Sequence, residues 1–240
     1  MREDVQLEGG VGRLAGHLYM PELAPPFPTI LLCHGLTSCK ENYGEFARFL
    51  QQEGFAVLAY DCRGHGQSAG SLDGEAWRDV GVVLDYCRRH PRVDANRIGL
   101  VGSSMGAHNG LRAAAEYPQL RTVVAFCTAP GAVLKMGLLS ADYWHAIQAS
   151  GGRVRITLPS YLTYLEGDDI FDLPARIRPR PMLFIHARDD ELIPYVVSER
   201  LHASAGEESR LLLLESGGHR GPRHDPQVQR EAANWLHHKL

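Results

Sequence analysis

Short apolar runs rich in β-branched residues recur along the chain, and segments with helical spacing of apolar residues separate most of them. Six runs have this character: residues 29–35, 55–61, 97–103, 122–127, 181–186 and 210–215. Strands that are apolar at nearly every position are typical of a parallel sheet buried on both faces. We therefore expect an α/β fold with a mostly parallel central sheet and helices on both of its faces.

Helices are predicted between these strands and at the end of the chain. Four segments fit best: residues 41–54, 73–91, 192–204 and 226–240. The first ends at Gly54, a residue suited to a helix C-cap, and the second stops at Pro91. Pro194 suits the first turn of the third helix.

Two further segments lie outside this alternation. Residues 5–21 alternate about a Gly-Gly pair and predict an antiparallel hairpin at the sheet edge. Between residues 128 and 177 the pattern breaks down, so we expect a small cap insertion over the strand ends within a single domain of residues 1–240. Four aromatic residues of this insertion either line a pocket or pack the cap, and packing is the favoured interpretation: Tyr143, Trp144, Tyr161 and Tyr164.

Composition excludes several classes of protein. The hydrophobic fraction of 44% and charged fraction of 22% are those of an ordinary globular protein, and the net charge of −3 gives no reason to expect a nucleic acid or an anionic membrane as partner. No secretory signal or membrane-spanning run is visible, so a cytoplasmic location is expected. The five cysteines lack CxxC spacing, which predicts buried reduced thiols. No histidine pair has the spacing of a structural zinc site, and we expect no metal or organic cofactor.

The segment IGLVGSSMGAHNG (residues 98–110) runs from a predicted strand into helix-forming residues through two adjacent serines. A nucleophile on a sharp strand-to-helix turn needs very small residues two positions before and after it, because the turn presses their backbone against neighbouring elements. Counted from Ser104 these residues are Gly102 and Gly106, whereas counted from Ser103 they are bulky. The spacing therefore selects Ser104. A Gly-Ser turn also serves packing or phosphate binding, so partner residues are required.

An acid and a histidine follow Ser104 in the order that such a site needs, each in a loop after an apolar run. The loop ARDDELIP offers Asp189 and Asp190, and SGGHRG offers His219, with His224 a distant second choice. A serine hydroxyl needs a base, and the imidazole needs a carboxylate that fixes its tautomer. We expect His219 to be the base, while the residues themselves do not decide between the two aspartates.

The negative charge that develops on a carbonyl oxygen needs backbone N–H donors. One donor is expected from Met105, directly after the nucleophile. The other is expected from the turn CHGLTS after the first long strand, where we select the N–H of Leu36. The side chain of His34 in this turn is expected to be structural.

These motifs together resemble the α/β-hydrolase superfamily, in its serine esterase, lipase and aminopeptidase-like branch. The stretches that carry the resemblance are HGLTSCKENYGEFARFLQQEGFAVLAYDCRGHGQSAG, VDANRIGLVGSSMG, HARDDELIP and GGHRG. In this family the acid commonly lies three residues before a Val-Pro or Ile-Pro pair, as Asp190 does before Ile193 and Pro194. The resemblance therefore favours Asp190 over Asp189.

The stretch DCRGHGQS (residues 61–68) is similar to a family loop that belongs to the fold and not to the triad. The resemblance thus implies that Asp61, Arg63 and His65 form a hydrogen-bonded loop, and not a metal site or a second base.

The resemblance implies a serine hydrolase, and we expect a carboxylesterase that cleaves small acyl esters through an acyl-enzyme. The same triad serves peptidases, thioesterases and lactone hydrolases, although a dienelactone-type enzyme would place a cysteine where Ser104 stands. Outside the enzymes, the alternative is a binding module on a hydrolase fold. The short cap, with Lys135 in its most apolar piece, favours small soluble esters over long-chain triglycerides. Acyl and alcohol specificity and oligomeric state are not fixed by the sequence.

Overall fold

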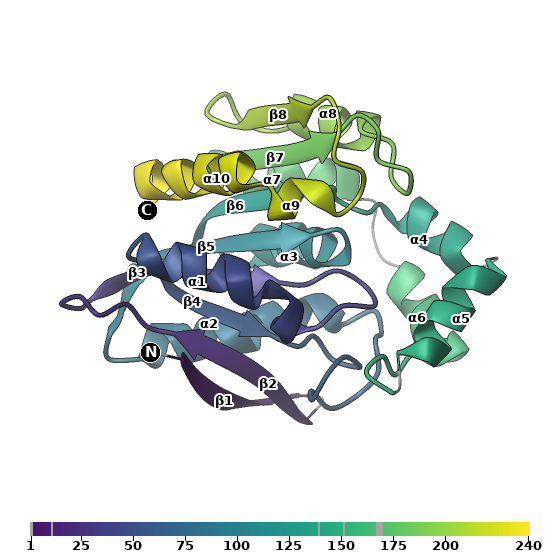
Figure 1. Ribbon diagram of the computed structural model, residues 1–240, viewed down its shortest axis with the longest axis horizontal. Coiled ribbons are helices and arrows are strands. Elements are labelled where there is room, and N and C mark those ends of the chain that lie inside the picture. The colour runs from purple at the N-terminus through teal and green to yellow at the C-terminus, as the bar shows by residue number, and fades with distance from the viewer. Residues whose placement is uncertain (1, 11, 139, 151, 167–169) are drawn as a thin grey trace.

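A computed structural model describes residues 2–10, 12–138, 140–150, 152–166 and 170–240. Among these residues an eight-stranded sheet forms the centre of the protein, in the order β1-β2-β4-β3-β5-β6-β7-β8 (Figure 1). Its strands are β1 (Arg2–Gly9), β2 (Gly12–Tyr19), β3 (Phe27–Cys33), β4 (Ala56–Tyr60), β5 (Val93–Ser103), β6 (Leu120–Phe126), β7 (Met182–Ala187) and β8 (Arg210–Leu214). From β4 to β8 all neighbours are parallel, while β1 and β2 are antiparallel.

The six predicted strands and the predicted hairpin are all present in this sheet. Each residue of β4 and of β7 is buried, as expected for strands covered on both faces. The hairpin pairs Gly9 with Gly12, and β2 continues the sheet through β4. The predicted α/β architecture is therefore confirmed.

Helices cover both faces, and the sheet separates two hydrophobic cores. Figure 1 shows α1 and α10 in front of the sheet, and α2 and α3 behind it. Phe46 of α1 and Leu236 of α10 belong to one core, whereas Val80 of α2 and Leu111 of α3 belong to the other. The helices that flank the sheet are α1 (Gly44–Gln52), α2 (Asp79–Arg89), α3 (Met105–Glu116), α8 (Val196–Ala203), α9 (Gly221–His224) and α10 (Pro226–Lys239).

Three of the predicted helices begin later than expected. The helix predicted over residues 73–91 begins at Asp79, after a 3₁₀ turn η2 (Ala76–Arg78), because Asp73 accepts hydrogen bonds from Arg63 and from the Glu75 N–H in a loop. The helix predicted over residues 192–204 begins at Val196, so placing Pro194 in its first turn was wrong. The cause of this second difference lies in the candidate site, described below. The helix predicted over residues 41–54 begins at Gly44, after a 3₁₀ turn η1 (Lys40–Tyr43).

Between β6 and β7 the chain forms a group of short helices beyond the carboxyl ends of the strands (Figure 1). These are α4 (Gly131–Leu138), α5 (Ala141–Ala149) and α6 (Leu158–Leu165). A 3₁₀ turn η3 (Ile170–Asp172) and α7 (Leu173–Ile177) follow behind the sheet, where α7 packs on α3. The segment is tied to the body near Gly64, where the Arg155 N–H donates to the Gly64 carbonyl at 2.6 Å. Val154 also forms a β-bridge with His65.

The aromatic residues of this segment contribute to packing where the structure describes them. Tyr161 and Tyr164 are buried, with ring centroids 6.0 Å apart in a stacked arrangement. The Tyr161 hydroxyl donates to the Leu134 carbonyl at 3.2 Å, and Tyr164 donates to Asn109 of α3 at 3.1 Å. Trp144 is half-buried, and the side chain of Tyr143 lies outside the described residues.

No helix in the described residues is long and apolar enough to cross a membrane. The cysteines are unpaired and buried, as predicted: Cys33, Cys39, Cys62, Cys87 and Cys127.

Candidate active site

The strand-to-helix turn predicted at Ser104 is present, and it places this serine in an unusual backbone conformation. β5 ends at Ser103 and α3 begins at Met105, so Ser104 alone forms the turn between them. Its backbone has φ 55° and ψ −115°, a positive φ that non-glycine residues adopt rarely and that is concentrated at functional sites. Ser103 by contrast belongs to the strand and is 9% exposed.

The two glycines that selected Ser104 are required by close backbone packing. A Cβ on Gly102 would lie 2.5 Å from the carbonyl oxygen of Gly106. A Cβ on Gly106 would lie 2.6 Å from the carbonyl oxygen of His34 and still closer to that of Cys33. These neighbours are backbone atoms that cannot rotate away, so the physical reason given for the spacing is confirmed.

Backbone hydrogen bonds fix the turn against the neighbouring strand. The Ser104 N–H donates to the Phe126 carbonyl of β6 at 2.9 Å, and the Ser104 carbonyl accepts from the Ala129 N–H at 3.3 Å. Cys127, the residue that follows β6, donates its N–H to the Ile185 carbonyl of β7 at 2.9 Å. The serine is thereby held in register with the end of β7, after which the acidic loop follows.

Asp190 and His219 meet at this end of the sheet. Nδ1 of His219 lies 2.9 Å from Oδ2 of Asp190, although 29 residues separate them. The other oxygen, Oδ1, accepts from the N–H groups of Leu192 and Ile193 at 2.9 and 2.8 Å. The Ile193 carbonyl faces Nε2 of His186 at 3.0 Å, while the Val197 N–H donates to the Pro194 carbonyl at 3.0 Å, so the regular helix α8 starts only at Val196.

The surroundings of Asp190 favour its ionised form. Its side chain is fully buried, whereas that of His219 is 11% exposed. Burial alone raises the pKa of Asp190, but hydrogen bonds from His186, His219 and the Ile193 N–H outweigh burial, so the pKa of this carboxyl lies well below its usual value. An ionised carboxylate at Nδ1 makes that nitrogen the protonated one and leaves a lone pair on Nε2, as a base requires.

The neighbouring candidates have different contacts. Oδ1 of Asp189 accepts from the Gly218 N–H at 2.8 Å and does not contact the imidazole. Glu191 accepts from the backbone N–H of His219 at 3.1 Å. His224 is exposed on α9, where its Nε2 lies 2.8 Å from an Arg223 nitrogen. Of the four sequence candidates, the structure thus brings Asp190 and His219 together.

The proposed oxyanion donors lie beside the serine turn. Met105 is the first residue of α3, and the N–H groups of a first helical turn have no acceptor within the helix. The turn that contains Leu36 packs on the same place, because a Cβ on Gly35 would lie 3.5 Å from the Ser104 Cβ. Tyr43 fixes this turn by accepting the Gly35 N–H at 3.2 Å.

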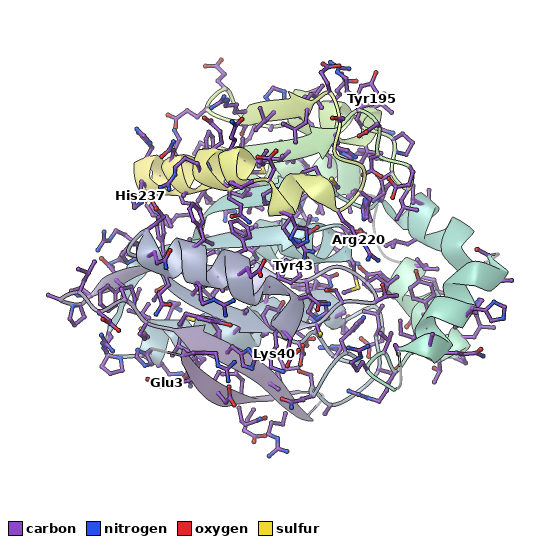
Figure 2. The ribbon with its side chains drawn as sticks, viewed as in Figure 1. Glu3, Lys40, Tyr43, Tyr195, Arg220 and His237 are labelled. Carbon is purple, nitrogen blue, oxygen red and sulfur yellow. The ribbon has the colours of Figure 1, made fainter. Side chains whose placement is uncertain are left out.

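Tyr43 also connects this turn with the chain that follows His219. The Arg223 guanidinium of α9 lies over the Tyr43 ring, 4.0 Å from its centroid. Figure 2 labels Tyr43 together with Arg220, which directly follows His219. The contact between Arg223 and Tyr43 therefore connects the segment that follows His219 with the turn that contains Leu36.

His34 and the loop of residues 61–68 have the structural role that the sequence predicts. Nε2 of His34 accepts the Cys62 N–H at 3.0 Å, and Nδ1 donates to the Gly35 carbonyl at 2.8 Å. Burial lowers the pKa of His34, which suits this neutral ring. Asp61 is fully buried and accepts from Nζ of Lys40 at 2.8 Å, while Arg63 forms an ion pair with Asp79 at 2.7 Å.

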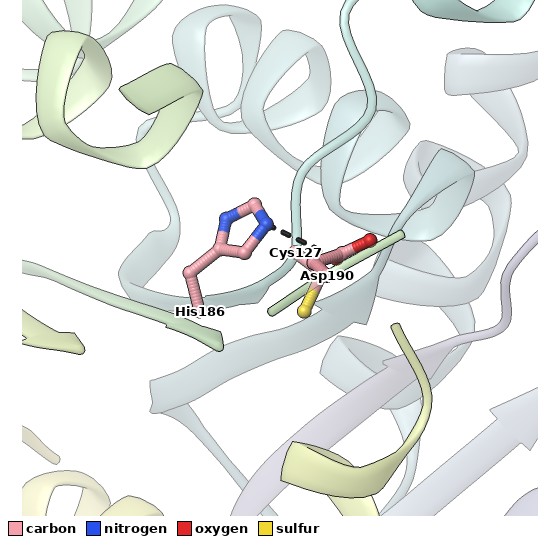
Figure 3. Close-up of side chains that lie close together, drawn as sticks. All are labelled: Cys127, His186 and Asp190. Atoms are coloured by element: carbon pink, nitrogen blue, oxygen red, sulfur yellow. Dashed lines mark hydrogen bonds and ion pairs between the residues drawn. The ribbon is translucent and has the colours of Figure 1, made fainter. Parts of the chain in front are cut away.

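One cluster near Asp190 has the residue types of a metal site. Candidate ligand atoms of Cys127, His186 and Asp190 lie within 4.8 Å of one another (Figure 3). However, Nε2 of His186 lies between two acceptors, Asp190 Oδ2 at 3.1 Å and the Ile193 carbonyl at 3.0 Å, so it carries a proton. Burial and the Asp190 carboxylate raise the pKa of the Cys127 thiol, which also keeps its proton. These groups therefore fit a hydrogen-bond network better than a metal site.

Sequence reasoning missed His186 and Cys127. Cys127 directly follows β6, and His186 is the residue before the last of β7, so both look like core positions in the sequence. The available signal was their place at the carboxyl ends of strands, which is where ligands bind in open α/β sheets.

Residues 24–160 of the chain match the family described as "Serine aminopeptidase, S33". The chain is 26% identical over 220 residues to a Bacillus subtilis protein named putative esterase YitV, covering 82% of this chain and 84% of the relative. It is 27% identical over 252 residues to esterase FrsA of Klebsiella pneumoniae, covering 96% of this chain and 57% of that relative. The chain thus spans little more than half the length of FrsA.

Solved structures show the same fold. The α/β hydrolase GrgF from Penicillium sp. sh18 matches with a TM-score of 0.85 at 19% identity, covering 100% of this chain and 99% of the other. Est1E from Butyrivibrio proteoclasticus, in a structure with ferulic acid, matches with a TM-score of 0.81 at 18% identity, covering 98% of both chains. These likenesses establish the α/β-hydrolase fold.

Proposed function

Because the chain belongs to the serine aminopeptidase S33 family and has the α/β-hydrolase fold, we propose that it is a serine hydrolase that cleaves small acyl esters. The observation that carries the proposal is the combination of Ser104 at positive φ with a buried Asp190 carboxylate 2.9 Å from His219. A strained turn and a buried carboxylate–imidazole pair are both costly, and both are typical of catalytic sites.

In the proposed mechanism Ser104 Oγ attacks the ester carbonyl, and Nε2 of His219 takes its proton. Asp190 stabilises the imidazolium that forms. The backbone N–H groups of Leu36 and Met105 donate to the oxyanion, and donors of this kind are each worth about 3 kcal/mol. His219 then gives its proton to the leaving alcohol, which leaves an acyl group on Ser104.

The second half of the reaction reuses the same groups. Water gives a proton to His219 as its oxygen attacks the acyl carbonyl, and the proton returns to Ser104 when the acid leaves. The proposed reaction steps use no metal or organic cofactor. Every proton that leaves one group is received by another within the triad or the substrate.

Two observations support esters of small acids as the substrate class. The relatives YitV and FrsA carry esterase names. The segment between β6 and β7 consists of short helices, and Lys135 of α4 is exposed on it, which suits a soluble substrate better than an oil interface. Peptide, thioester and lactone hydrolysis use the same triad and are the competing outcomes of the test.

The test is hydrolysis of p-nitrophenyl esters from acetate to palmitate by the wild type, Ser104→Ala and the matched control Ser103→Ala. We expect the wild type to prefer short chains, Ser103→Ala to keep its activity, and Ser104→Ala to lose at least about a thousandfold in kcat. Greater activity on emulsified palmitate would contradict the small-ester assignment. Absence of hydrolysis of every ester would favour an amide, thioester or lactone substrate, or a binding role.

A further inference from the structure

The carboxylate of Asp190 is shared by two histidines. Oδ2 lies 2.9 Å from Nδ1 of His219 and 3.1 Å from Nε2 of His186. His186 is fully buried at the end of β7, whereas His219 is partly exposed. The proposed mechanism uses His219 and leaves His186 without a part.

The ring of His186 is held in one orientation by contacts on both sides. Nδ1 lies 2.7 Å from Oγ of Ser198, which is fully buried on α8. Nε2 faces the Ile193 carbonyl at 3.0 Å as well as Asp190. Because Nε2 faces two acceptors, it is the protonated nitrogen, and Nδ1 accepts a hydrogen bond from the Ser198 hydroxyl. The tautomer that donates to Asp190 is therefore fixed by Ser198 and Ile193.

We propose that His186, oriented by Ser198, is a positioning residue that holds Asp190 and limits the strength of its hydrogen bond to His219. The inference rests on the proposed function, in which His219 is the base. A carboxylate oxygen that receives a second donor carries less charge toward the first. His186 therefore weakens the stabilisation that Asp190 gives to a His219 imidazolium.

Other charged groups face the same pair and remain in place when His186 is changed. Asp189 accepts from the Gly218 N–H and Glu191 accepts from the His219 N–H. Arg220 directly follows His219 in the sequence. Cys127 faces Asp190 from the end of β6. A difference between variants at His186 therefore reports on the His186 donor against a constant background.

Three variants separate this role from simple packing. His186→Phe keeps a ring and removes the donor, His186→Gln keeps a donor at the position of Nε2, and Ser198→Ala removes only the contact that orients His186. We expect His186→Phe to lower kcat by about 10- to 100-fold with KM within about twofold, and to move the acidic limb of the kcat/KM profile upward by about half a pH unit. His186→Gln restores both, and Ser198→Ala shifts the limb less in the same direction.

A direct measurement is the NMR titration of His219 in protein labelled with ¹³C-histidine, with the resonance identified by its loss in His219→Gln. The pKa of His219 is expected to rise in His186→Phe and to return in His186→Gln. The exposed His237 on α10, labelled in Figure 2, serves as an internal control. An unchanged His219 pKa in both His186→Phe and Ser198→Ala overturns the proposal.

This titration does not depend on turnover, so the two claims fail separately. Absence of ester hydrolysis by the wild type contradicts the proposed function, whereas a constant His219 pKa contradicts the role of His186. If His186→Phe does not fold, shown by loss of the wild-type NMR dispersion, Ser198→Ala carries the test alone. A Ser198→Ala profile identical to the wild type then overturns the proposal.

Discussion

The carboxylate of Asp189 accepts a hydrogen bond from the Gly218 N–H at 2.8 Å, one residue before the histidine whose ring contacts Asp190. Two adjacent aspartates thus hold the same loop in different ways. Asp189 anchors its backbone, while Asp190 accepts a hydrogen bond from Nδ1 of the imidazole and so fixes its tautomer.

The two aspartates are expected to differ strongly on substitution. Asp190→Asn places an amide against Nδ1 and favours the wrong tautomer of His219, so kcat falls by about 10⁴. Asp189→Ala loosens the loop and lowers kcat by about tenfold at most, without changing the tautomer. Steady-state kinetics on p-nitrophenyl acetate measures both. A loss with Asp189→Ala that equals the loss with Asp190→Asn would show that the roles are assigned wrongly.

Gly106 tests the packing of the serine turn. In Gly106→Ala the new methyl group meets backbone carbonyls of Cys33 and His34, which cannot move without shifting β3, so we expect the free energy of unfolding to fall by about 3 kcal/mol. Gly131→Ala is the matched control, because nothing lies within 4 Å of a Cβ there, and its effect is expected to stay below about 1 kcal/mol. Urea unfolding followed by circular dichroism compares them. Equal stability of the two variants would refute this account of the glycine.

His65 predicts how stability depends on pH. Its ring is fully buried 5.0 Å from that of His34, and burial, followed by the neighbouring His34, lowers the pKa of His65 to about 3. Between this value and the ordinary 6.5 the unfolded chain binds a proton that the folded protein does not. The free energy of unfolding therefore decreases as the pH falls through 6.5, by about 2 kcal/mol between pH 7 and pH 5 for this one group.

The check is urea unfolding of the wild type, His65→Gln and the exposed control His145→Gln at pH 7 and pH 5. His65→Gln is expected to lose less stability on acidification than the wild type by about 2 kcal/mol, whatever its stability at pH 7. His145→Gln should follow the wild type. The same decrease in all three proteins would mean that His65 is not buried neutral.

The parts of the molecule that local chemistry determines were predictable from sequence. The strands were found because they are apolar at nearly every position, and Ser104 because close backbone packing admits only glycine at Gly102 and Gly106. The acid and the histidine were found in loops after apolar runs, because the carboxyl ends of parallel strands share one edge of the sheet. These features depend on residues near one another in sequence or on the sheet topology alone.

Other features depend on side-chain directions that the sequence does not carry. Asp189 and Asp190 are adjacent in one loop, and the residues alone left the choice open until the Ile193-Pro194 spacing of the family was used. The start of α8 was misplaced because the Ile193 carbonyl faces the His186 ring, while the Val197 N–H, which a longer helix would bring to Ile193, donates to Pro194. The contacts of His186 were not predicted because a polar residue within an otherwise apolar strand looks like part of the core.

The central claim is that Ser104 is the nucleophile, and the most direct measurement is covalent labelling with a fluorophosphonate probe, mapped by peptide mass spectrometry. We predict one adduct per wild-type chain, on Ser104, with full labelling of Ser103→Ala and none of Ser104→Ala. A wild-type protein that takes up no probe, or an adduct that persists in Ser104→Ala, would contradict the account.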